Sequence, residues 1–536
     1  MKRTVSGYAA CLMALVPMAG ITAASGCSGQ SPDGDEDPVS HETGAATNNG
    51  ATDPGPRAGA AGAGAPLVTQ PFDQESATQQ AQVAVACFPG LQPGMKLLCE
   101  EAILRFQEID SIAGTTVSTG IPGFIPKGTV ESGTGVGPTY NNVGCAICHS
   151  QPGVLGAGVG PASPQFPGQP NPQVAIATLD GAKNTVPSFI TATGPIREAR
   201  FKSDSGVHDL YTIAGRSDAP GCNAVQPPFA AQLAAGNVSF RIPIATFGDG
   251  LVEEVAEQSL MTNLTNAQAN TQFNTGGTFN TSGNDGTITR FGWKAQNKSL
   301  TIFAGEAYNV EQGVSNFVFT NERFGGATNL QGCFGFIGAP EDAPGFLTAP
   351  STTNQGNVCE INADIFNFAL AMQLSAPAVP STAAIPASAC DTAVFGSCAN
   401  AATQGLNEFV NIGCANCHTH QLTTPAISAI DPAFQNVTFA PFSDFAIHHM
   451  GAGLEDGVTQ GNAGPDQFRT APLWGVGQRL FFLHDGRTAD LTAAIAAHFS
   501  AASGGFPASD ANTVINNFNA LSESNQQAIL VFLRSL

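Results

Sequence analysis

Positive charge is scarce in this chain. Its 536 residues include 20 lysines and arginines against 41 aspartates and glutamates, which gives a net charge of -21 at neutral pH. Nucleic acids and anionic membrane surfaces are bound through clustered lysine and arginine side chains, so the composition argues against both as partners. Charged residues make up only 11% of the chain, and its 61 glycines and 36 prolines indicate much irregular, loop-built structure.

Long hydrophobic runs are lacking beyond the N-terminus. The one such run, Val5 to Ala24, follows two basic residues and ends shortly before Cys27. This pattern is typical of an export signal, so residues 1–27 are interpreted as a signal peptide of the lipoprotein type, with lipidation at Cys27. Position 24 lacks the usual large aliphatic residue, which leaves ordinary secretion as the alternative. We expect an exported bacterial protein, periplasmic or anchored to the outer membrane through a lipid, and no transmembrane helix after cleavage.

Histidine is also rare, with nine in the chain, yet two of them directly follow Cys-x-x-Cys pairs. Such pairs occur in zinc sites, redox dithiols and disulfides as well. A pair followed at once by histidine is the attachment signature of c-type haem, in which both thiols bond to the haem and the imidazole ligates the iron. Two copies in an exported chain predict two covalently bound haem c groups, at Cys145, Cys148 and His149 and at Cys414, Cys417 and His418.

The remaining cysteines are expected to form disulfides, because export places them in an oxidising compartment. Their spacing suggests three local pairs and leaves Cys222 over. Connectivity does not follow from spacing alone, so these pairings are hypotheses: Cys87–Cys99, Cys390–Cys398 and Cys333–Cys359.

Composition divides the chain into segments. Residues 28–81 have hardly any large apolar side chains and are predicted to be a disordered tether. An N-terminal haem domain at 82–380 follows, with a loop-rich insertion at about 152–284 that contains short strands. A C-terminal cytochrome c domain spans 381–536. The fold class is mainly α, with predicted helices around residues 100–106, after Ser299, at 406–410 and after Ser522. The last of these helices has an apolar stripe formed by Ile529, Phe532, Leu533 and Leu536.

Four stretches of this sequence resemble the bacterial di-haem oxidoreductase family of peroxidase-like proteins, which is distantly similar to the dihaem cytochrome c peroxidases and to MauG. The likeness extends from about Gly135 to the C-terminus, apart from much of the insertion. The stretches are 135–149, 290–300, 442–457 and 468–498.

The resemblance implies different roles for the two haems. In the peroxidases the C-terminal haem is a six-coordinate electron reservoir, whose sixth ligand lies fourteen residues after the histidine of a His-Asp-Gly motif. That motif begins here at His484, and the count leads to His498. His418 and His498 are therefore expected to ligate this iron, with Met450 as the alternative to His498. Imidazole in place of thioether lowers the potential, which puts a high-potential role in doubt.

The resemblance also implies that the N-terminal haem is the peroxidatic one. Relatives place a distal glutamate over it in an Asn-Pro-x-Glu-Met-Gly motif, and the nearest match here is Asn309 to Gly313, with Glu311 as the candidate. A carboxylate suits this task, because it takes a proton from peroxide and returns it to the departing oxygen. The spacing is shorter than in the peroxidases, and their distal glutamine position falls near Phe303. A solvated loop glutamate is the alternative.

Trp293 and Trp474 lie in the shared stretches and are candidates for an electron path, with simple aromatic packing as the alternative. Four basic residues are candidates for pairing with haem propionates, with ordinary salt bridges as the alternative. The relatives also hold calcium between their domains; the threonine and proline expected before His484 are replaced here, so calcium is left open. The four basic candidates are Arg290, Lys294, Arg469 and Arg487.

These patterns together predict an oxidoreductase that reduces hydrogen peroxide at the N-terminal haem. Electrons would enter from a redox protein such as a small cytochrome and pass through the C-terminal haem. Two alternatives stay open. One is a dihaem electron-transfer protein without peroxidase activity. The other is a dihaem oxygenase acting on an organic or polymeric substrate, with the insertion shaping its site.

Overall fold

The computed structural model describes residues 86–536 apart from short internal stretches, of which the longest are 159–170, 334–341 and 343–362. The predicted signal peptide, tether, lipidation site at Cys27 and the disulfide partner Cys359 lie outside the described residues. No helix in the part of the chain described is both long and apolar enough to cross a membrane.

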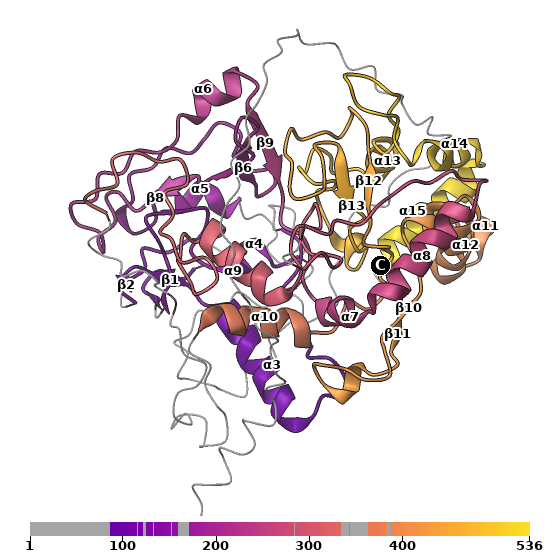
Figure 1. The fold of residues 1–536 in the computed structure, drawn as a ribbon, viewed down its shortest axis with the longest axis horizontal. Coiled ribbons are helices and arrows are strands. Elements are labelled where there is room, and N and C mark those ends of the chain that lie inside the picture. Colours follow the sequence, from indigo (N-terminus) through magenta and orange to yellow (C-terminus); the bar gives the residue numbers. More distant parts are fainter. Residues whose placement is uncertain are drawn as a thin grey trace, which may run out of the picture.

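Helices carry most of the regular structure (Figure 1). The described residues contain thirteen α-helices, most of them short: α3 (Pro93–Phe106), α4 (Cys145–Cys148), α5 (Pro172–Ile176), α6 (Phe229–Ala234), α7 (Asp249–Glu254), α8 (Glu257–Ala269), α9 (Leu300–Glu311), α10 (Asp364–Leu374), α11 (Thr392–Phe395), α12 (Cys398–Asn411), α13 (Leu491–Ala496), α14 (Asn512–Ala520) and α15 (Glu523–Ser535).

The strands are shorter still and pair mostly in antiparallel twos; β1 and β4 are parallel, and β7, β6 and β9 form a three-stranded sheet in that order. An α-rich fold with short strands agrees with the sequence prediction. The strands are β1 (Asp110–Ser111), β2 (Thr116–Val117), β3 (Val130–Glu131), β4 (Gly133–Thr134), β5 (Thr139–Tyr140), β6 (Glu198–Phe201), β7 (Val207–His208), β8 (Tyr211–Thr212), β9 (Val238–Arg241), β10 (Leu422–Thr423), β11 (Thr438–Phe439), β12 (Ile447–His449) and β13 (Gln467–Arg469).

Helices α3, α9 and α10 form the helical part of the N-terminal region, where α10 packs against both of the others (Figure 1). Helix α10 is almost entirely apolar and buried along most of its length, as expected for a helix enclosed by neighbours. Helix α9 begins where the sequence predicts, because the Ser299 side chain accepts a hydrogen bond from the Ile302 N–H. The helix ends at Glu311, with Gln312 as its C-terminal cap.

Helices α12 and α15 pack side by side as the framework of the C-terminal region (Figure 1). The predicted apolar stripe of α15 is buried in one cluster with Phe409 of α12. Ser522 caps α15 by accepting a hydrogen bond from the Asn525 N–H, as predicted. Helix α12 ends at Asn411, just before the second Cys-x-x-Cys-His motif, and so positions that motif beside the buried cluster.

The insertion contains more helix than its composition predicts, because α5, α6, α7 and α8 all lie within it. It also reaches the C-terminal region. The Asn263 side chain of α8 donates to the Thr419 hydroxyl at 2.8 Å. A second contact involves Gly413, which directly precedes Cys414 and has a φ of +101°. A Cβ at Gly413 would lie 2.5 Å from the ring of Phe273, which belongs to the insertion. The insertion therefore packs directly on the second motif.

Buried ion pairs join the two regions. Asp456, in the C-terminal region, pairs with Arg241 of β9 at 2.8 Å and with the Lys294 ammonium at 3.1 Å. Burial alone would raise the pKa of Asp456, but the two cations lower it below its ordinary value. The carboxylate is therefore charged, and it holds the insertion and the 290–300 stretch against the C-terminal region.

Three disulfides occur among the described cysteines. The predicted pairs Cys87–Cys99 and Cys390–Cys398 are confirmed. The pairing of Cys333 with Cys359 is wrong, because Cys333 bonds to Cys222. Backbone hydrogen bonds between Val225 and Thr328 run in both directions and bring these distant segments together, which spacing along the chain cannot indicate.

Candidate functional site

A first cavity surrounds the N-terminal motif. Helix α4 carries Cys145 and Cys148, and His149 follows as its C-terminal cap. Both cysteines and the imidazole line a cavity together with side chains of α9 and α10. His149 Nδ1 lies 3.0 Å from the Gly156 carbonyl oxygen, which places the ring proton on Nδ1 and the lone pair on Nε2. Burial lowers the pKa of His149, so the ring is neutral, as a metal ligand must be.

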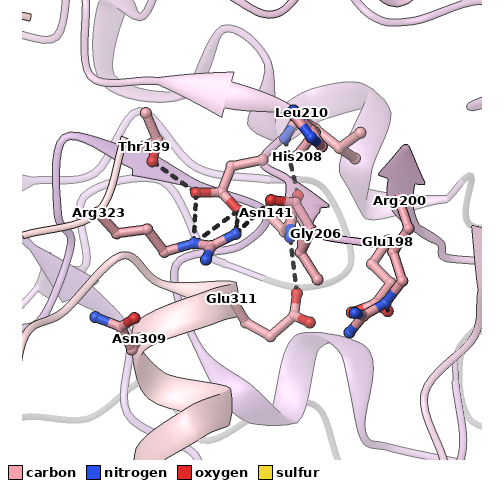
Figure 2. A network of polar contacts seen from close by, with 12 residues as sticks. Thr139, Asn141, Glu198, Arg200, Gly206, His208, Leu210, Asn309, Glu311 and Arg323 are labelled. Atoms are coloured by element: carbon pink, nitrogen blue, oxygen red, sulfur yellow. Dashed lines mark hydrogen bonds and ion pairs between the residues drawn. The ribbon is translucent and has the colours of Figure 1, made fainter. Parts of the chain in front are cut away.

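Glu311 lies at the C-terminal end of α9 and lines this cavity. The Asn141 side-chain amide donates to Glu311 Oε2 at 3.0 Å (Figure 2). Asn141 Oδ1 in turn accepts from the Leu210 N–H at 2.8 Å, so the amide group faces Glu311 with its donor. The Asn141 N–H also donates to the Glu311 carbonyl at 2.7 Å. The carboxyl group is thus held by a loop that belongs to the first shared stretch.

A second carboxyl group stands beside Glu311. Glu198 of β6 lines the same cavity and pairs with the Arg200 guanidinium at 2.6 Å. Figure 2 shows Glu311 extending from its helix toward Asn141, with Glu198 and Arg200 beside it. Both side chains are half-buried at the cavity wall, and their carboxyl groups interact through a side-chain hydrogen bond.

The two carboxyl groups titrate in opposite directions. Burial, followed by the neighbouring Glu198, raises the pKa of Glu311 well above its ordinary value. Burial would also raise the pKa of Glu198, but Arg200 and Arg241 outweigh it and lower that pKa. These environments favour the proton on Glu311 and the negative charge on Glu198, so the pair can both donate and accept a proton.

A second cavity surrounds the C-terminal motif and is lined by Cys414, Cys417, His418 and His498. His418 Nδ1 lies 2.9 Å from the Phe442 carbonyl oxygen, and His498 Nδ1 lies 2.8 Å from that of Ala494. Both rings therefore carry a lone pair on Nε2. Burial lowers the pKa of His418 to about 4 and also lowers that of His498. Two neutral imidazoles thus line one cavity.

Two further groups lie at the second cavity. Met450, the alternative to His498, also lines it. Cys417, Asp444 and His448 are the one set of three metal-type ligands that the described residues bring within 4.8 Å. His448 Nε2 lies 2.9 Å from Asp444 Oδ2, so the histidine is oriented by the carboxylate. Since Cys417 belongs to the second motif, this cluster is part of the second site.

The donor sets of both cavities fit haem. The four motif cysteines are the free thiols among the described residues, whereas the other described cysteines are in disulfides. Each cavity pairs two thiols with a neutral, oriented imidazole, which is the ligand chemistry that haem c requires.

The two tryptophans differ in position. Trp293 lines both cavities, and its indole N–H donates to the Ile242 carbonyl at 2.8 Å. Its ring meets that of His484 edge to face, with ring centroids 6.4 Å apart. Trp474 lines neither cavity; its indole N–H donates to the Ala440 carbonyl at 2.7 Å. The structure thus separates two residues that the sequence presents as equivalent.

Of the four basic residues considered for propionates, only Arg469 lines a cavity, the second one. Arg290 donates to carbonyls at the end of α7, with its shortest contact 2.6 Å to Val255. Lys294 binds Asp456 and three backbone carbonyls, and Arg487 pairs with Asp485. Ordinary structural contacts account for these three.

A family model matches residues 230–536, just over half of the chain, under the description "Di-haem oxidoreductase, putative peroxidase". The chain belongs to the di-haem oxidoreductase family. The resemblance seen in the sequence is thereby confirmed for the family, and haem cofactors and oxidoreductase chemistry follow from it. The match begins inside the insertion and leaves the first motif outside. No curated protein matches the chain significantly, and the similarity to MauG stays a prediction.

Three residues of these di-haem sites were not singled out by sequence reasoning. Asn141 lies within a recognised stretch, and its position just before the first motif was an available signal. Glu198 lies in the insertion, where no motif marks it. Arg479, a cavity-lining residue, stood out only as a departure from the relatives.

Proposed function

We propose that this protein reduces hydrogen peroxide at the first cavity with electrons relayed from the second. The observation that carries the proposal is the difference between the residues that line the two cavities together with the motif histidines. The first cavity has a carboxyl pair that shares one proton, Glu311 with Glu198. The second has an additional neutral imidazole, His498. One site is built to move protons and the other to hold a fixed ligand.

The residues of each motif would hold one haem c. Cys145 and Cys148 would form the thioether bonds of the first, with His149 as iron ligand. In the second site Cys414, Cys417 and His418 would do the same, and His498 would be a further iron ligand. The bound haems supply the redox chemistry, delivering the two electrons that convert one hydrogen peroxide, with two protons, into two waters.

The protons are the task of the carboxyl pair. Because Glu311 and Glu198 share one proton and one charge, the pair accepts the proton that leaves the attacking end of peroxide and returns it to the departing oxygen. Asn141 keeps the Glu311 carboxyl group turned toward the cavity during both transfers. Arg200 and Arg241 hold the negative charge of the pair on Glu198.

Trp293 lines both cavities, so its indole ring provides an aromatic group between the two sites. We assign it to the electron path between them. Trp474 stays outside this path. The electron donor is a redox protein such as a small cytochrome, and the cellular location is outside the cytoplasmic membrane, with attachment through a lipid at Cys27. Calcium has no role in the proposal.

Glu311→Gln tests the proposal, because glutamine keeps the size and one hydrogen bond but cannot exchange the proton. We expect turnover with hydrogen peroxide and a reduced cytochrome to fall by about 10² to 10⁴-fold. The control is Glu306→Gln, which changes a carboxylate of the same helix that lines the same cavity but bonds to Asn297. Glu306→Gln should keep its turnover within a few fold of the native protein.

Two results would reject the proposal. Equal turnover in Glu311→Gln and the native protein would remove Glu311 from the reaction. Absorption and electron paramagnetic resonance spectra of the half-reduced protein provide the second criterion. If both haems stay six-coordinate and low-spin, peroxide has no access, and electron transfer alone remains.

A further inference from the structure

Arg479 is a buried cation of the second cavity that lacks a partner for part of its guanidinium. Its side chain lines the cavity and only 8% of the residue is exposed. Its Nε and Nη2 atoms are buried and have no hydrogen-bond partner among the described residues. Burial lowers the pKa of Arg479 to about 10, and no acidic group of the described chain acts against that effect.

Other buried cations of this protein have acidic partners. Arg216 binds Asp218 at 2.9 Å, and Arg241 binds Asp456 at 2.8 Å. Arg469, which lines the same cavity as Arg479, faces the charge of Asp249 and donates to the Arg290 carbonyl at 2.9 Å. Arg479 therefore differs from these three buried arginines, each of which has an acidic group as a partner or close by.

The backbone around Arg479 is firmly held. Its carbonyl accepts a hydrogen bond from Arg534 Nη1 at 3.0 Å. The following N–H, of Leu480, donates to Gln151 Oε1 at 3.3 Å, which ties this turn to the segment after the first motif. The guanidinium cannot leave the cavity by a shift of the main chain without breaking both contacts.

A buried charge without a partner is strongly unfavourable, so a native structure retains one only where a ligand compensates it. The planar fork of arginine matches a carboxylate, to which it donates two parallel hydrogen bonds. The other walls of this cavity include two thiols and two imidazoles, the donor set of haem c, and haem carries two propionate carboxylates. We propose that Arg479 binds a propionate of the haem held by Cys414, Cys417 and His418.

This contact has a consequence for electron relay. A fixed positive charge beside the haem favours the reduced state, because reduction adds a negative charge to the site. Arg479 thus raises the potential of the second haem and offsets part of the lowering that His498 causes as an imidazole ligand. The inference rests on haem binding at the second motif and does not depend on peroxide reduction at the first.

The test compares Arg479→Gln, Arg479→Lys and a control in the purified protein with both haems attached. The control is Arg487→Gln, a partly exposed arginine in the same segment whose partner is Asp485. Redox titrations followed by electron paramagnetic resonance give the potential of each haem. Resonance Raman spectra give the propionate bending modes, which respond to hydrogen bonding at the carboxylate.

We expect Arg479→Gln to lower the potential of the second haem alone and to shift one propionate mode. Arg479→Lys should shift the same mode but retain most of the potential, since it keeps the charge and loses the fork. Arg487→Gln should change neither. An Arg479→Gln protein with native potentials and native propionate modes overturns the proposal. If that variant fails to accumulate with its haems, unchanged propionate modes in Arg479→Lys overturn it equally.

Discussion

The two Cys-x-x-Cys-His regions share a sequence pattern and differ in almost everything around it. In both, the motif histidine donates its Nδ1 proton to a backbone carbonyl, of Gly156 in one case and Phe442 in the other. The first cavity then adds ionisable groups, led by Glu311 and Glu198. The second adds the imidazole of His498, the guanidinium groups of Arg469 and Arg479, and many apolar side chains. The motif supplies the residues for haem attachment, whereas segments distant in the sequence supply the other side chains that line each cavity.

This difference arises because different segments of the chain line each cavity. The first takes a carboxyl group from the end of α9 and another from β6, a strand of the insertion. The second takes its extra histidine from the segment just after α13, within the C-terminal region. Because the insertion contributes to the first cavity and packs on the second motif through Phe273, it influences both sites.

The largest change to this comparison is expected from His498→Ala, which removes the proposed second iron ligand of the C-terminal haem. The second haem should become high-spin, and both sites would then have an open position. Spectra of the oxidised protein measure this directly. The matched variant Met450→Leu, at the alternative ligand in the same cavity, should stay low-spin. A near-infrared thioether band that survives His498→Ala would instead assign the ligand to Met450.

Local signals explain which parts of the fold could be predicted from sequence. Helices α9 and α15 were predicted because a capping serine precedes each, and α15 also has an apolar stripe. Helix α8 was missed, since it buries only Leu260 and Leu264 and its remaining residues are mostly polar. Its position is fixed by tertiary contacts, such as that of Asn263 with Thr419, which leave no periodic pattern in the sequence.

The same distinction applies to the sites. Cysteines and histidines of one motif line one cavity because they are adjacent in the chain. Glu311 could be named from its place in a family-like stretch, and the structure puts it in the first cavity. Glu198 and Arg479 could not be identified from the sequence. Glu198 becomes notable only when folding places it beside charged groups, and Arg479 only when folding buries it without a partner for part of its guanidinium. The pairing of Cys222 with Cys333 was missed for the same reason.

A smaller effect is expected from Glu198→Gln, which removes the carboxylate beside Glu311. Glu311 returns a proton only while protonated, so turnover falls as the pH rises through its pKa. Burial and the Glu198 charge both raise that pKa. Glutamine removes the charge and keeps the burial, so the alkaline limb of the pH–rate profile should move to lower pH. The loss at neutral pH should be less than in Glu311→Gln.

The pH profile distinguishes this role from a structural one. Loss of the Arg200 ion pair alone would reduce the amount of folded protein without moving either limb. Glu306→Gln serves again as the control, since it removes a carboxylate from the same cavity. An alkaline limb that stays in place in Glu198→Gln, or moves equally in Glu306→Gln, contradicts the shared proton.

The smallest effect concerns the connection between the two sites. Trp293→Phe and Trp474→Phe each remove an indole N–H bonded to a backbone carbonyl, so each should cost about 1 kcal/mol of stability. Only Trp293 lines both cavities. Stopped-flow reduction should therefore show slower transfer between the haems in Trp293→Phe and native transfer in Trp474→Phe. Since both variants carry the same structural cost, equal transfer rates in the two would mean that the indole of Trp293 packs between the sites without carrying electrons.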